Sequence, residues 1–216
     1  MNALLVAAWT AWNRHSGWMA WNLFLAFIPL ALSVWLFRRT SQSHSILWWV
    51  GFLVFIAFLP NAPYLLTDII HLIHAIRTNY SVWIITLVLI PQHLLAILAG
   101  FEAYIVSLIN LGYYLHRQGA RKFIIWAELM THALSAVGIY LGRFKRFNSW
   151  DLVTQPDDLL ETVIDDLTSK RPVLVIAITF VVLTVLYWLM KQVTLGLMLK
   201  MRSKRGGSTS EETSIG

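Results

Sequence analysis

The chain has 216 residues, of which 57% are hydrophobic and 13% are charged, with a mean hydropathy of +0.62. A soluble domain carries about 25% charged residues, so this composition excludes an ordinary soluble domain. The net charge of +6 would suit nucleic acid, but the basic residues gather at the ends of apolar runs, as membrane insertion and anionic lipid favour. We therefore predict no nucleic-acid partner. The absence of cysteine excludes disulfides, thiolate metal sites and a cysteine nucleophile.

Long apolar runs predict an all-α polytopic transmembrane helical bundle with about five spans. About 20 residues at a rise of 1.5 Å cross the roughly 30 Å hydrocarbon core, so uncharged apolar runs of that length are expected to be spans. The lipid bilayer is therefore the expected partner of most of the surface. We predict a single transmembrane domain, residues 1–200, with spans at about 18–37, 46–76, 82–115, 123–141 and 172–190.

Both ends of the chain fall outside these predicted spans. The first apolar stretch, Ala3–Trp12, is too short to span and is predicted to lie at the interface or to cap the bundle. No basic region precedes it and no clear cleavage site follows, so a signal peptide is not predicted. Residues 201–216 have the composition of a disordered tail.

Prolines predict irregularities in two of the spans. Pro60-Asn61-Ala62-Pro63 removes two backbone donors and disfavours helix at the preceding positions, so the span 46–76 is predicted to be broken at 60–63. Asn61 is expected to cap the restarted helix. The run 82–115 is too long for one perpendicular span and too short for two, so we predict one helix, tilted or kinked at Pro91.

The long polar loop before the last span, residues 150–169, predicts an amphipathic acidic helix outside the membrane. Between 157 and 167 the apolar residues fall in an arc of about 140°, with acidic residues opposite. The acidic face argues against adhesion to anionic headgroups, so this helix is expected to pack on its own bundle or on a protein partner. The apolar residues of the arc are Leu159, Leu160, Val163, Ile164 and Leu167.

The distribution of basic residues predicts the orientation in the membrane. Ten Lys and Arg residues lie on the side of the C-terminus, and seven lie on the side of the second and fourth loops. The excess of positive charge places the C-terminus in the cytoplasm. The opposite side is called the loop-two/loop-four face below.

Two motifs carry a resemblance to a known family. FLPNAPYLLTDIIHL (Phe58–Leu72) and GIYLGRFKRFNSWD (Gly138–Asp151), in this order, resemble the bacterial membrane-protein family with domain of unknown function 1361. The similarity extends from about Asn22 to Pro172. It implies a multi-span protein of the bacterial cell (inner) membrane, and it supplies no activity and no catalytic residue.

Ionisable side chains inside the apolar runs are the candidates for chemistry, because burying them in a membrane is costly. Asp68 and His71 share one helix face with Tyr64, and Glu128 lies one turn from His132. Asp68, His71 and His74 have a carboxylate–imidazole spacing that suits a divalent transition metal. This spacing is not diagnostic, since a polar helix face in the headgroup zone gives the same pattern, and no cofactor is evident. The candidate catalytic residues are Asp68, His71, Glu128 and His132.

Residue counting predicts where these groups lie. His93 and His132 are expected about 15–16 Å below the loop-two/loop-four face, whereas Glu102 is expected about 30 Å from it. At that face the segments after Asn61 and after Arg143 can meet, and arginine suits a phosphate through bidentate hydrogen bonds. We therefore predict a polar site opening on this face, with Glu128, His93 and His132 beneath it. The candidate binding residues are Asn61, Tyr64, His93, Arg143, Arg146, Asn148 and Asp151.

Three classes of function stay open at this point. The polar residues and the acidic helix suit an accessory or assembly protein, in which intramembrane polar groups hold helices together. The mixture of Asp, His and Arg suits a membrane-embedded enzyme acting on a lipid or lipid-linked phosphate. The broken span suits a small transporter or flippase-like protein. The sequence does not fix the oligomeric state.

Overall fold

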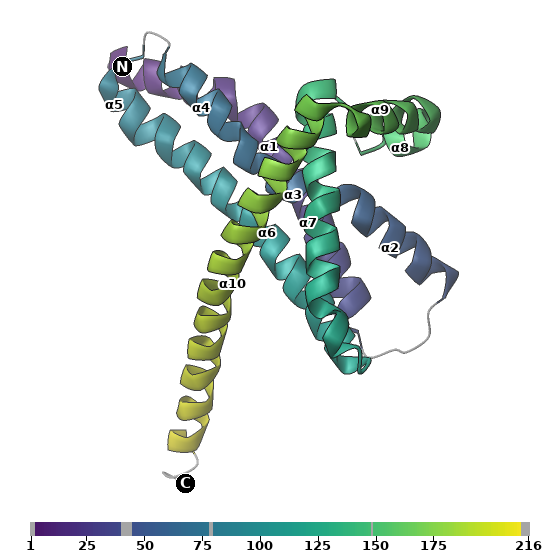
Figure 1. Cartoon of the computed structure of the whole chain (residues 1–216). Helices are drawn as coiled ribbons and strands as arrows, with labels where there is room; N and C mark the ends of the chain where they lie inside the picture. Colours follow the sequence, from purple (N-terminus) through teal and green to yellow (C-terminus); the bar gives the residue numbers. More distant parts are fainter. Residues whose placement is uncertain (1–2, 40–44, 78–79, 148, 213–216) are drawn as a thin grey trace.

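The computed structural model describes residues 3–39, 45–77, 80–147 and 149–212, which form helices and connecting turns without a strand (Figure 1). Five helical segments in this part are long and apolar enough to cross a membrane: Leu5–Phe37, Ile46–Ile76, Val82–Arg117, Arg121–Lys145 and Lys170–Met201. The predicted fold class, an all-α bundle with five such helices, is confirmed.

The first helix, α1 (Ala3–Phe37), is continuous and includes the stretch that the sequence predicts to lie apart at the interface. Ala11 is fully buried in a small apolar cluster with Ala75, Ile84 and Leu89 from the next two spans. Gln92 Nε2 also donates a hydrogen bond to the Trp12 carbonyl at 3.4 Å. No proline interrupts the chain between Trp12 and the predicted start of the span, so the helix runs on and packs against its neighbours.

The second span is broken beside Pro60. The helix α2 (Ile46–Phe58) ends there, and α3 (Asn61–Tyr64), the 3-10 turn η1 (Leu65–Asp68) and α4 (Ile69–Ile76) follow. Asn61 does not act as the expected cap. Its Nδ2 donates back to the Phe58 carbonyl at 3.0 Å, satisfying an acceptor that the break leaves without its helical donor.

Glycines of two other helices allow the break to lie in the bundle interior. A Cβ on Gly138 would lie 2.7 Å from Pro60 Cβ, and a Cβ on Gly142 would lie 3.2 Å from a ring carbon of Tyr64. Gly138 and Gly142 are one turn apart, on α7 (Ile124–Tyr140) and in the π turn η4 (Leu141–Lys145) that continues it. Such a small-xxx-small pair lets backbones approach closely within a membrane. On the other side, a Cβ on Gly100 would lie 3.2 Å from the Ala62 carbonyl oxygen.

The third span is one long helical run, with α5 (Val82–Ile84), the π turn η2 (Ile85–Leu89) and α6 (Ile90–Arg117) in succession. The π turn lies directly before Pro91, which lacks the backbone N–H that a regular turn requires. The irregularity expected at Pro91 is therefore taken up by wider hydrogen-bonded rings. α6 packs along α1 and leads to the 3-10 turn η3 (Arg121–Phe123) and α7.

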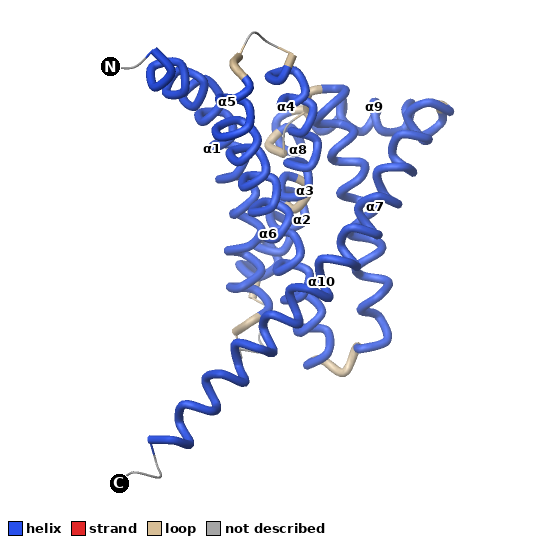
Figure 2. Tube along the Cα trace, turned by 90° about the vertical axis from the view of Figure 1, so that its left-hand side faces the viewer, coloured by secondary structure: helices blue, strands red, loops and turns tan. Residues whose placement is uncertain are grey.

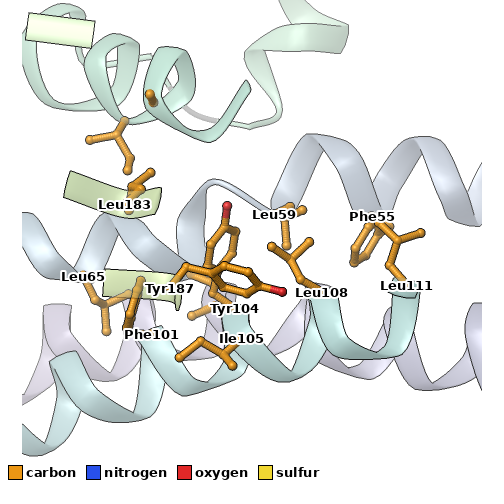
Figure 3. Packing of buried hydrophobic residues seen from close by; sticks show 14 of the residues in the cluster. Phe55, Leu59, Leu65, Phe101, Tyr104, Ile105, Leu108, Leu111, Leu183 and Tyr187 are labelled. Carbon is orange, nitrogen blue, oxygen red and sulfur yellow. The ribbon is translucent and has the colours of Figure 1, made fainter. Parts of the chain in front are cut away.

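The last span belongs to α10 (Lys170–Glu212), which packs on α7 and α6 through one seam. Leu183 and Tyr187 point from it into the core, where Tyr187 lies beside Tyr104 and near Leu108 (Figure 3). Beyond this seam α10 extends away from the other helices to the carboxyl end (Figure 2). The described helix thus continues to Glu212, where composition predicts disorder; residues 213–216 lie outside the described part.

The acidic loop forms two helices, α8 (Asp151–Thr154) and α9 (Pro156–Thr168), which lie across the end of α7 (Figure 1). An ion pair of 3.0 Å between Lys145 Nζ and Asp166 Oδ2 ties α9 to the end of that span. The apolar arc of α9 divides into two parts. Leu159 and Val163 face the bundle, whereas Leu160, Ile164 and Leu167 are half or more exposed.

Candidate functional site

A cavity of about 480 Å³ lies at the loop-two/loop-four face, beneath α9. Its walls come from α1, from α2 and α3 at the break, and from α7 with its π turn, and α9 contributes the roof. The break in the second span lies in the cavity wall, since Ala57, Pro60 and Asn61 on either side of it are among the lining residues.

The cavity changes character along its depth. The lining residues Ile56, Leu134 and Val137 belong to α2 and α7, whereas Asn61 and Arg146 lie beyond the ends of these helices. Eight residues of α7 separate Leu134 from Gly142 at the outer end, which corresponds to about 12 Å along the helix. The cavity therefore has an apolar inner part along α2 and α7 and a polar end next to the loop before α8.

The polar end is held by contacts between distant parts of the chain. Asn61 Nδ2 donates to Ser149 Oγ at 2.7 Å, joining the break in span two to the loop before α8. Arg146 adopts a left-handed conformation with φ of 63°, and its N–H closes the π turn on the Leu141 carbonyl. This conformation is uncommon for a residue with a side chain, and it reverses the chain direction above the cavity.

A second polar group, the Asp68–Arg143 cluster, lies directly behind the cavity wall. Arg143 Nη2 lies 3.6 Å from Asp68 Oδ1, and Nη1 donates to His71 Nε2 at 3.1 Å. Arg143 Nη2 also donates to the Thr67 carbonyl. Because a guanidinium only donates, His71 carries its own proton on Nδ1. The arginine therefore joins the end of α7 to both η1 and α4.

Two residues form the partition between the cavity and this cluster. Asn22 lines the cavity and donates to Asp68 Oδ2 at 3.4 Å, and Tyr64 lines the cavity and carries the Arg143 guanidinium 5.4 Å from its ring centroid. Asp68 is only 3% exposed, yet its Oδ1 has no hydrogen-bond partner, and neither has Arg143 Nε. Buried groups of this kind are usually satisfied by water or by a ligand.

His93 lies in a row of rings next to the cluster and does not line the cavity. Trp18 stands between His71 and His93, with centroid distances of 4.7 and 6.0 Å, and His15 lies 5.5 Å from His93. His93 Nδ1 donates to the Leu89 carbonyl at 2.8 Å, which leaves its buried Nε2 as an acceptor without a partner.

Glu128 and His132 belong to another part of the molecule, the interface between α7 and α10. Glu128 Oε1 accepts from Tyr187 Oη at 2.7 Å and from Lys191 Nζ at 2.5 Å. His132 Nδ1 instead pairs with Tyr104 Oη at 2.7 Å. The structure thus does not place this pair beneath the cavity with the other predicted site residues. Both groups find their partners on neighbouring helices.

Three other polar residues considered from the sequence remain: Glu102, which is expected far from the site, and the binding candidates Asp151 and Asn148. Glu102 accepts from Thr194 Oγ1 at 2.8 Å, so a second acid contacts α10. Asp151 begins α8 and accepts from Thr154, outside the cavity lining. Asn148 lies outside the described residues.

The metal site considered from the sequence is not assembled in the described part of the chain. No group of three or more His, Asp or Glu side chains there is arranged to hold a metal ion. Asp68 and His71 both contact Arg143, whereas the exposed His74 turns its Nδ1 to the Ile70 carbonyl at 2.8 Å.

Sequence reasoning missed several residues that these sites depend on. Asn22 is a single polar residue within the apolar run of α1, and Ser149 lies in a loop, so nothing in their spacing singles them out. Lys191 did carry a signal, because it interrupts the long apolar run that begins at Pro172. At the end of a span it resembles an interfacial anchor, and only the packing of α10 shows its pairing with Glu128.

Comparisons with known proteins support one assignment. Neither the curated proteins nor the solved structures contain a match to this chain. The family described as "Protein of unknown function (DUF1361)" matches residues 21–185, which is most of the chain and includes the break, the cavity walls and α9. The chain belongs to this family of unknown function.

Proposed function

We propose that this protein is an accessory membrane protein that holds an amphiphilic molecule of the lipid class in the cavity beneath α9. The observation that carries the proposal is the division of the cavity into an apolar inner part and a polar outer end. A lipid in the leaflet on that side has the same arrangement, with its headgroup at the surface and its chains inside.

The cavity walls support entry from the bilayer. Trp21 and Leu134 line the cavity and are nevertheless 52% and 51% exposed, so the cavity is continuous with the outer apolar surface of the helices. An acyl chain can therefore enter sideways without crossing the polar end. The proposed location is the bacterial cell (inner) membrane, with the loop-two/loop-four face outside and the C-terminus in the cytoplasm.

Retention of lipid by the purified protein tests the proposal. The protein is extracted in mild detergent, and bound lipid is measured by native mass spectrometry for the wild type and for Val137→Trp, which fills the inner part of the cavity. The matched control is Val185→Trp, at an exposed position of α10. We expect lipid on the wild type and the control and none on Val137→Trp. Equal lipid on all three proteins would refute the proposal.

The Asp68–Arg143 cluster favours a second candidate, an enzyme acting on a lipid or lipid-linked phosphate. The Asp68 carboxylate, the His71 imidazole and the Arg143 guanidinium lie together, separated from the cavity by the side chains of Asn22 and Tyr64. They are suited to acid–base chemistry on a phosphate-bearing headgroup. This candidate differs from the accessory role in one measurable respect. An enzyme releases a chemically altered lipid, and Asp68→Asn abolishes that conversion while lipid retention persists.

A further inference from the structure

The chemistry of the polar end identifies the headgroup, and this inference rests on the proposed lipid-binding function. Among the described residues that line the cavity, Arg146 alone carries a formal charge at neutral pH. It lies at the polar end, next to Asn61 and Ser149 in the lining. A single cation at the mouth of an otherwise neutral cavity favours an anionic ligand.

The position of Arg146 is set by its backbone. It is the one non-glycine residue with positive φ in the described part of the chain, and the Phe147 N–H also turns back to the Leu141 carbonyl at 3.2 Å. Residues held in such sparsely populated conformations tend to occur at functional sites. Here the conformation places an arginine, not a glycine, where the chain crosses the cavity mouth.

The hydrogen bonds of Asn61 and Ser149 leave one acceptor and one donor for a ligand. Both hydrogens of the Asn61 amide group are used, on the Phe58 carbonyl and on Ser149 Oγ. Its Oδ1 can therefore only accept a hydrogen bond. Ser149 Oγ accepts from Asn61, so its own hydroxyl hydrogen is available to donate.

We infer that the cavity selects a phospholipid whose headgroup combines an anionic phosphodiester with a hydroxyl group, as in phosphatidylglycerol. Arg146 and the Ser149 hydroxyl contact the phosphate oxygens, and Asn61 Oδ1 accepts a hydrogen bond from the headgroup hydroxyl. A choline head offers no donor to Asn61, and any ammonium head brings a second cation next to Arg146.

Lipids that differ only in the headgroup test this inference. The delipidated protein is titrated with phosphatidylglycerol, phosphatidylmethanol and phosphatidylcholine of the same acyl chains, and occupancy is measured by native mass spectrometry. Phosphatidylmethanol keeps the anionic phosphodiester and lacks the hydroxyl. We expect the affinity to fall in the order glycerol, methanol, choline, with at least a several-fold step at each change.

Two variants show which residue causes each difference in affinity between the lipids. Asn61→Ala should remove the step between phosphatidylglycerol and phosphatidylmethanol, and Arg146→Gln should remove the step between both anionic lipids and phosphatidylcholine. The matched controls are Asn13→Ala and Arg77→Gln, at exposed positions outside the cavity lining. They should leave both steps unchanged.

The titrations of the wild type and of the variants together separate the possible failures. Equal binding of the three lipids, abolished by Val137→Trp, overturns the inference and leaves the proposed function standing. Absence of any binding overturns both. If the wild type shows both steps but Arg146→Gln retains the anionic preference, Arg146 is not the recognition group and the inference is wrong.

Discussion

Lys191 and Glu128 form an ion pair between α10 and α7, two helices long and apolar enough to cross a membrane, with side chains 23% and 9% exposed. Tyr187 donates to the same carboxylate oxygen. Removing one member of such a pair leaves the other as an uncompensated charge, which costs far more than the pair contributes. The net contribution of the ion pair to stability can therefore be measured only when both residues are changed together.

We predict that Lys191→Met destabilises the protein by about 3 kcal/mol, because Glu128 is left without a cation in a buried setting. Adding Glu128→Gln should recover most of that loss. Denaturant unfolding of the wild type, both single variants and the double variant measures the coupling. A double variant no more stable than Lys191→Met would show that the ion pair is not the source of the loss.

Substitution of Arg143 tests how much of the protein's stability depends on the geometry of its guanidinium group. Arg143→Lys keeps the positive charge, but a single ammonium cannot contact Asp68, His71 and the Thr67 carbonyl together. We expect a loss of about 1–3 kcal/mol, since buried polar atoms lose their partners. Arg77→Lys, at an exposed position, serves as the control in the same unfolding measurement. Equal stability of the two variants would mean that charge alone suffices.

At the scale of elements, the packing of α7 against the break depends on a missing side chain. A methyl group at Gly138 would lie 2.7 and 2.8 Å from two ring carbons of Pro60, and a proline ring has little freedom to move away. We predict that Gly138→Ala destabilises the protein by about 1–3 kcal/mol, as overpacking does in other cores.

The control for this substitution is Gly196→Ala on α10, where an added Cβ meets nothing within 4 Å. That variant should be neutral or slightly stabilised, because alanine is the better helix former. Thermal unfolding in detergent compares the two. An unchanged midpoint for Gly138→Ala would show that the two elements can separate without cost.

The attachment of α9 is weaker than the packing of the spans. Asp166 is largely buried, but the Lys145 side chain is 38% exposed, so solvent screens the ion pair and it contributes less than about 1 kcal/mol. We expect Lys145→Gln to leave global stability almost unchanged and to increase amide hydrogen exchange within α9 alone. Exchange that rises equally in α7 would contradict the view of α9 as a separately attached roof.

The sequence predicts elements well where the cause is local. Prolines 60 and 63 interrupt the second span, and apolar runs mark the five long helices. Features that depend on packing between distant segments are not predicted. The amino-terminal stretch joins α1 because Ala11 packs against Leu89. Glu128 does not bind His132, and its hydrogen-bond partners are residues of α10 about 60 positions later in the chain. Spacing brings side chains to one face, but it does not say which helix covers that face.

At the scale of the whole molecule, α9 and the end of α10 lie at opposite ends of the bundle (Figure 1). We predict that they lie on opposite sides of the membrane. The absence of cysteine makes this easy to measure. We predict that Thr154→Cys reacts with an impermeant maleimide in intact cells, and that Ser203→Cys reacts only after permeabilisation. Both positions are exposed in the structure. The reverse pattern would place the cavity on the cytoplasmic side.

The hydrogen bond between Asn61 and Ser149 joins residues 88 positions apart. During translation, at about 5–20 residues per second, the broken span reaches the membrane roughly 4–18 s before its partner exists. For most of that interval Asp68 lacks Arg143, and Pro60 lacks the α7 surface that later covers it. The nascent second span thus enters the bilayer with polar groups that only a later segment can satisfy. We therefore expect the second span to stay beside the insertion machinery until α7 arrives.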